Sequence, residues 1–237
     1  MRCSRSICAL AASLALAFLV TGCQTAAPAS DASAAGPAGT GPSPVNERSE
    51  RERAEWEAAI AGLGFDTGRV VVDAPPSRSD EARAARLMEA GDTELASNHR
   101  TQAVAAYAAA VRAAPDLPEA HIALGEAMIA KGKTDLALAC YRTALDLRPD
   151  DTETRFALAE TLAREMRFEE AIDEMEAVVA AVPGHGRAHE RLAIWQYYGE
   201  DYGAAWRHVR AARAAGHEMP PQFITLLSGK MAESDVR

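Results

Sequence analysis

Apolar residues recur at helical spacing through the central part of this chain, and the stretch 118–151 shows the pattern most clearly. Two groups of apolar residues lie on either side of Gly132: Ile122, Leu124, Met128 and Ile129, then Leu136, Ala137, Tyr141, Ala144 and Leu145. Each group follows the three-to-four-residue spacing of one helix face, and the glycine interrupts it. The pattern predicts a helix, a turn and a second helix.

The same pattern returns along the chain in steps of 34 residues, marked by Pro115, Pro149 and Pro183. A repeat of this length is typical of stacked helical units, none of which can bury its apolar face alone. Within a repeat domain over 79–219 we therefore expect four units, covering residues 84–117, 118–151, 152–185 and 186–219.

One unit carries a family resemblance in the order of its large and small residues: Leu124, Gly125, Met128, Gly132, Ala137, Tyr141, Ala144 and Pro149. This order resembles the tetratricopeptide repeat. The resemblance implies an all-α fold, a right-handed α-solenoid of about four helix-turn-helix units. Small residues such as Gly125 and Ala137 are expected where two helix backbones nearly touch.

The resemblance also implies a binding groove, because in this family the first helices of successive units line a concave surface. The fifth, ninth and twelfth positions of each unit would face it: Met88, Asp92 and Leu95; Ile122, Glu126 and Ile129; Phe156, Glu160 and Ala163; Glu190, Ile194 and Tyr197. We hypothesise that the groove binds a protein or peptide partner whose basic residues meet Asp92, Glu126 and Glu160. The alternative is a solvated acidic face with no partner.

The N-terminal segment reads as a lipoprotein leader over 1–22. Arg2 and Arg5 precede an apolar run too short to span a bilayer, and Cys23 follows. The residues ending in Cys23 resemble a bacterial lipobox, which implies acylation of Cys23 and stable membrane attachment. Gln24, by resemblance to other lipoproteins, favours the outer membrane, with the domain on its periplasmic face. Residues 23–45, rich in Ala, Pro, Gly and Ser, are expected to form a flexible tether.

The segments flanking the repeats have their own patterns. Over 46–78 we expect an amphipathic helix with Trp56, Ile60 and Leu63 on one face, ended by Gly64, and then irregular linker. That helix either docks on the first repeat or binds a partner, and the run of valines at 70–72 is too isolated to build a sheet. Over 220–237 we expect a capping helix and tail, and the apolar face of that helix would consist of Phe223, Leu226, Leu227 and Met231.

Charge and composition narrow the function further. The net charge is −9, or −11 without the leader, and such a surface repels nucleic acid. Cys140 is the one cysteine within the predicted repeats, so no disulfide framework is expected. The pair His185 and His189 does not share one helix, which argues against a metal site. With no motif for a phosphate loop, nucleophile or paired carboxylates, we expect neither an enzyme nor a cofactor.

The fourth unit concentrates aromatic residues beside Arg187 and Arg191, namely Trp195, Tyr197, Tyr198, Tyr202 and Trp206. Stacking faces beside guanidinium groups suggest an alternative function, binding of a cell-wall glycan. A second alternative is an accessory subunit that regulates an envelope enzyme by contact. The principal hypothesis is a lipid-anchored scaffold for protein interactions in the bacterial envelope. Resemblance to lipoproteins of this class, and nothing else, suggests a role in assembly of a pilus, secretion pore or other envelope complex.

Overall fold

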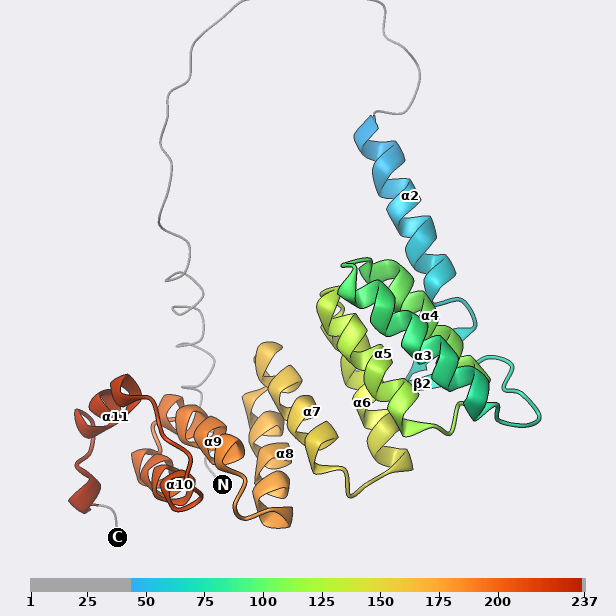
Figure 1. Cartoon of the computed structure of the whole chain (residues 1–237). Helices are drawn as coiled ribbons and strands as arrows, with labels where there is room; N and C mark the ends of the chain where they lie inside the picture. Colours follow the sequence, from blue (N-terminus) through green and yellow to red (C-terminus); the bar gives the residue numbers. More distant parts are fainter. Residues whose placement is uncertain (1–43, 236–237) are drawn as a thin grey trace, which may run out of the picture. The chain divides into compact units, whose positions relative to one another are not determined.

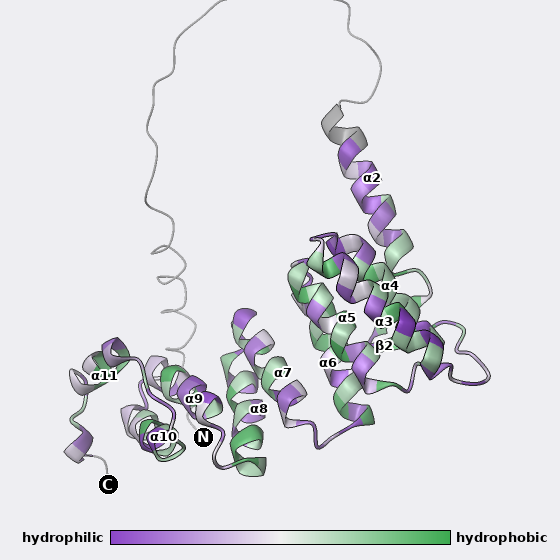
Figure 2. Cartoon of the chain, viewed as in Figure 1, coloured by the Kyte–Doolittle hydropathy of each residue, from purple (hydrophilic) through white to green (hydrophobic). Residues whose placement is uncertain are grey.

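The computed structural model describes residues 44–235, so the leader, Cys23 and most of the tether lie outside the described residues. The chain divides into two compact units, 1–54 and 55–237. Helix α2 (Pro44–Ala59) runs across this boundary. Its first-unit part is strongly hydrophilic (Figure 2) and contains an ion pair between Arg48 and Glu52, 3.1 Å apart.

The second unit contains four helical hairpins in sequence order (Figure 1). They are α3 (Glu81–Ala96) with α4 (Arg100–Ala113), α5 (Pro118–Ala130) with α6 (Thr134–Leu147), α7 (Thr152–Arg164) with α8 (Phe168–Ala181), and α9 (Gly186–Tyr198) with α10 (Tyr202–Ala214). Each hairpin packs on the next through α4 and α5, α6 and α7, and α8 and α9. The predicted all-α repeat fold is confirmed.

The turn inside each hairpin uses one residue in the left-handed region of backbone conformation. These residues lie 34 positions apart and have φ between 61° and 75°: Asn98, Gly132, Met166 and Glu200. Left-handed φ favours glycine and, less strongly, asparagine. The second repeat alone places a glycine there, so in the third and fourth units hairpin packing holds Met166 and Glu200 in a conformation that their side chains disfavour.

The small residues on the first helices serve a purpose that differs from the predicted backbone contact. A Cβ atom added at Gly91 would lie 2.6 Å from the ring of Tyr107, and one at Gly125 would lie 2.9 Å from the ring of Tyr141. The space is therefore filled by a tyrosine ring from the second helix. The third and fourth units have alanine at the glycine position, and the large ring is replaced there by Met175 and Val209.

A side chain at the fourth position of each later unit bonds to the proline that closes the unit before it. His121 Nε2 lies 2.8 Å from the carbonyl oxygen of Pro115, and His189 Nε2 lies 3.0 Å from that of Pro183. In the third unit Arg155 donates to the Pro149 carbonyl over 2.8 Å. These bonds satisfy a carbonyl that the proline junction leaves without a helical partner.

The segment before the repeats contains a β-hairpin, contrary to the prediction of an irregular linker. Strands β1 (Leu63–Asp66) and β2 (Arg69–Val72) pair antiparallel, with Phe65 opposite Val70. Helix α2 ends at Ala59, before the predicted stop, and Gly62 rather than Gly64 has positive φ. The isolated valines form a strand because Val70 is buried against the repeats.

This β-hairpin is held on the second helices of the first two units. The backbone N–H of Val70 donates to Thr143 Oγ1 on α6 over 2.9 Å, and Arg69 pairs with Asp146. Arg112 on α4 donates to the Ala61 carbonyl over 2.7 Å. Of the two uses predicted for the segment, the structure shows docking on the repeats.

The C-terminal end of the repeats is covered by α11 (Pro221–Ser228), which packs on α10. Phe223 and Leu227 are buried, whereas Leu226, predicted on the same face, is exposed. These residues belong to a small core with Trp206, separate from the larger core that runs through the first three units and includes Leu192 and Trp195 of α9.

Candidate binding surface on the first helices

The first helices α3, α5, α7 and α9 form one surface of the repeats, called here the A-helix face. Eleven of the twelve predicted groove residues are exposed or partly buried and therefore accessible to a partner; besides Glu190 they are Met88, Asp92, Leu95, Ile122, Glu126, Ile129, Glu160, Ala163, Ile194 and Tyr197. Phe156 is only 4 % exposed, stacked on His185 and covered by the Arg187 guanidinium, so it supports the surface without forming it.

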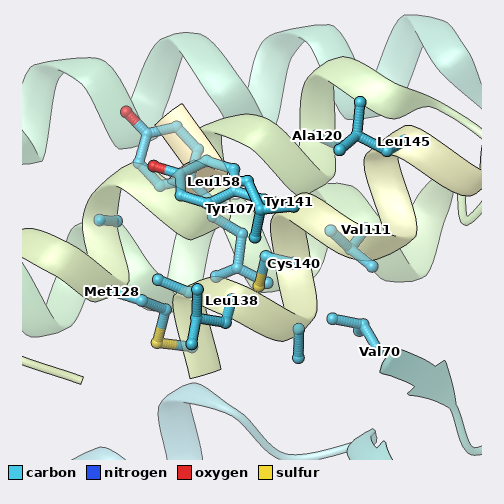
Figure 3. Packing of buried hydrophobic residues seen from close by; sticks show 14 of the residues in the cluster. Val70, Tyr107, Val111, Ala120, Met128, Leu138, Cys140, Tyr141, Leu145 and Leu158 are labelled. Carbon is cyan, nitrogen blue, oxygen red and sulfur yellow. The ribbon is translucent and has the colours of Figure 1, made fainter. Parts of the chain in front are cut away.

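The first two units present acidic groups beside tyrosine hydroxyls. Tyr107 passes over Gly91 and donates a hydrogen bond of 2.6 Å to Asp92, and burial together with this bond raises the pKa of Tyr107. Figure 3 shows Tyr107 and Tyr141 lying close together with their hydroxyl oxygens at the same side. Burial, followed by the nearby Asp92 carboxylate, raises the pKa of Glu126. Two carboxylates, Asp92 and Glu126, therefore lie on this half of the A-helix face with little positive charge close to them.

The third predicted acid differs from the first two because it is already paired. Arg191 Nε lies 2.8 Å from Glu160, and the same guanidinium lies 3.9 Å from Glu190. Glu190 also contacts His217, 2.7 Å away. The third unit thus keeps the apolar, acidic, apolar order in its sequence. Its acidic residue, however, is neutralised by an ion pair and adds no unpaired negative charge to the surface.

Sequence reasoning missed the residues that modify this surface. Tyr107 and Tyr141 looked like ordinary core residues, and Arg191 was considered only beside the aromatic residues. A signal was available for the tyrosines, since each follows by 16 residues a glycine at the eighth position of its unit, and only the first two units have glycine at that position. No comparable signal announces the pairing of Arg191 with Glu160, which joins helices 31 residues apart.

The aromatic residues of the fourth unit are engaged largely in packing. Trp206 is buried and donates from Nε1 to the carbonyl of Met231 over 2.9 Å. Tyr197 makes an edge contact with Phe223, with ring centroids 5.7 Å apart. Tyr198 is the one large aromatic among the five that is exposed. The rings do not form the open stacking platform that the glycan hypothesis requires.

Two histidines of the fourth unit form a buried polar pair. His189 Nδ1 lies 3.0 Å from His208 Nδ1, while His189 Nε2 faces the Pro183 carbonyl. Because a carbonyl only accepts, His189 Nε2 carries a proton, and in the neutral pair His208 Nδ1 then donates to His189. Burial, then His189 and Arg207, lowers the pKa of His208 to about 4, although Asp201 acts in the opposite direction.

Acidification is therefore expected to destabilise the fourth unit. The unfolded chain takes up this proton near pH 6.5 and the folded chain near pH 4, so stability falls as pH drops through 6.5. We expect a loss of about 1 kcal/mol between pH 7.5 and pH 5.5, measured by urea unfolding. His208→Asn, which keeps a donor near Nδ1 but does not titrate, should remove that part of the slope. Equal slopes in both proteins would contradict the assignment.

Other candidate chemistry finds no support in the part of the chain that the structure describes. Cys140 is fully buried, and burial raises the pKa of its thiol, which keeps it protonated and unreactive. Within residues 44–235, no group of three or more His, Cys, Asp or Glu side chains could hold a metal ion. No described helix combines the length and apolar character needed to cross a membrane.

Comparison with known proteins agrees with this architecture. The family model for the tetratricopeptide repeat matches residues 88–152 and again residues 129–186. No curated protein sequence matches the chain.

Solved structures of repeat proteins resemble the fold. A crystal structure of MamA is 17% identical with a TM-score of 0.58, over 65% of this chain and 86% of that one. MamA from Desulfovibrio magneticus RS-1, residues 41 to the end, is 20% identical with a TM-score of 0.55, over the same shares. YrrB, described as a TPR protein with an unusual peptide-binding site, is 25% identical with a TM-score of 0.52, over 64% of this chain and 77% of its own. The chain therefore has an all-helical tetratricopeptide-like fold, and residues 88–186 match that repeat family.

Proposed function

We propose that this chain is a scaffold that binds a segment of a protein partner on its A-helix face. The observation that carries the proposal is the pair Asp92 and Glu126, exposed on successive first helices between the accessible apolar residues Met88, Ile122 and Ile129. Such a surface suits a segment that combines apolar side chains with basic ones. The peptide-binding site ascribed to YrrB supports this use of the fold.

The structure modifies the predicted partner in one respect. Glu160 is neutralised by Arg191, so the basic residues of the partner would meet Asp92 and Glu126 and not all three acids. The N-terminal β-hairpin lies on α4 and α6, which leaves the predicted site free of that segment. The β-hairpin therefore does not cover the acidic half of the A-helix face.

The site of action is proposed from the sequence. Acylation at Cys23 would anchor the chain to the bacterial outer membrane, with the repeats on the periplasmic side, where assembly of envelope complexes takes place. The partner would then be an envelope protein. The contact-regulator alternative differs only in the identity of that partner, which would be an enzyme.

Photocrosslinking in intact cells tests this proposal. A photoreactive amino acid at Ile122, on the A-helix face, should crosslink to one discrete protein, and the double change Asp92→Lys with Glu126→Lys should reduce the crosslink at least about tenfold because the partner's basic residues are repelled. The measurement is the yield and mass-spectrometric identity of the crosslinked species.

A control position makes the outcome of the crosslinking experiment decisive. The same photoreactive residue at Leu147, exposed at the end of α6, should not give this crosslink. A crosslink from Ile122 that survives the double charge reversal would contradict the proposed surface.

Cys23→Ser should release the protein from the membrane fraction, and an unchanged distribution would contradict the anchor.

A further inference from the structure

A hollow of about 360 Å³ opens on the A-helix face between the third and fourth units. Helices α7 and α9 form its two sides, and the start of α8 closes one end. Its principal lining residues are Glu160, Arg164, Phe168, Arg191, Ile194 and Trp195. Three of the predicted groove residues, Glu160, Ala163 and Ile194, therefore belong to a concave site that can hold a side chain.

The floor of this hollow is apolar and well supported. Trp195 is only 9 % exposed, and Phe168 and Ile194 are partly buried against the core of the first three units. Side chains held in this way lose little conformational freedom when a ligand covers them. The floor therefore suits a large apolar side chain of the partner.

The rim of the hollow carries one arginine that can pair with a ligand. Arg191 is held by Glu160 and Glu190, so those three groups include no cation that is free to pair with a ligand. Arg164, in the last turn of α7, is exposed and makes no ion pair with any other residue in the range 44–235. Its guanidinium can present two parallel N–H donors to a carboxylate, the geometry in which arginine binds acids most strongly.

We infer that this hollow binds an acidic residue of the partner, next to a large apolar residue that covers Ile194 and Trp195. The inference rests on the proposed function and adds the orientation in which the partner segment binds. The first two units attract a basic residue through Asp92 and Glu126, whereas the hollow attracts an acidic one through Arg164. A partner segment with opposite charges at its two ends can lie on the A-helix face in one orientation only.

Selection from a displayed library of random peptides tests the inference, using the whole chain as bait. We expect the wild-type protein to enrich peptides with Asp or Glu at a fixed place beside a large apolar residue. The Arg164→Glu variant should enrich peptides with Lys or Arg at that place, and it should bind the wild-type winners at least about tenfold more weakly in a titration. Arg210→Glu, a change of an exposed arginine on the second helix α10, should leave both unchanged.

The possible results separate the inference from the function on which it rests. Peptides that are enriched by the wild-type chain and lost with Asp92→Lys and Glu126→Lys, but bound equally by Arg164→Glu, would overturn the inference and keep the proposed function. A wild-type chain that enriches no peptide would overturn both. Retained circular dichroism of each variant excludes unfolding as the cause.

Discussion

Replacing Trp206 with alanine is expected to lower the free energy of unfolding of the fourth unit by about 4 kcal/mol. Trp206 is 1 % exposed and lies at the centre of the small core formed by α10 and α11. The substitution leaves a large cavity and removes the hydrogen bond from Nε1 to the Met231 carbonyl. Both losses fall on the end of the repeats, where neighbouring units support the structure from one side only.

Urea unfolding would measure the loss of stability, and hydrogen exchange of the backbone amides would show which helices lose it. We expect the amides of α10 and α11 to lose protection first while those of α5 and α6 keep theirs, because Trp206 belongs to the small core and α5 and α6 belong to the larger one. Trp56→Ala is the matched control, since that indole packs against the larger core and its loss should leave the protection of α10 and α11 unchanged. A uniform loss of protection along all four units would contradict the local effect.

Gly91→Ala is expected to destabilise the first unit by about 2 kcal/mol, although alanine is the better helix former by about 1 kcal/mol. The added Cβ would lie 2.6 Å from the Tyr107 ring. This ring cannot easily move aside, because it is buried and its hydroxyl is bonded to Asp92. Overpacking should therefore outweigh the gain in helix propensity.

A second substitution tests whether the ring is the cause. Tyr107→Met, combined with Gly91→Ala, recreates the pairing of Ala159 with Met175 in the third unit and should recover at least about 1 kcal/mol relative to the single Gly91→Ala variant. Gly203→Ala, in a helix with no close neighbour at the new Cβ, should be neutral or slightly stabilising. Additive effects of the two changes in thermal or urea unfolding would contradict this account.

The repeats were predictable because the spacing of their apolar residues is a local pattern and recurs in four units. Helix spacing within 118–151 and the 34-residue recurrence of proline were sufficient to predict the helical hairpins. The β-hairpin was not predictable in this way. Val70 forms a strand because α6 buries it and Thr143 bonds its N–H, and that contact joins residues 73 positions apart.

The helix face that carries the acidic residues could be predicted from the sequence, whereas the ion pair that one of them makes could not. Helical spacing placed Asp92, Glu126 and Glu160 on one face, because spacing along a single helix determines which side a residue occupies. It does not reveal which acid has a partner on another helix. The pairing of Glu160 with Arg191 became visible only when the third and fourth units were stacked.

Attachment of the β-hairpin to α4 and α6 bears on how the protein carries mechanical load. The polypeptide enters the repeats on the side of the second helices, where Lys133 lies over the Trp56 ring and Asp146 holds Arg69. Tension transmitted along the polypeptide from its N-terminal end would be borne first by these attachments. Such tension would reach the A-helix face only after these attachments break.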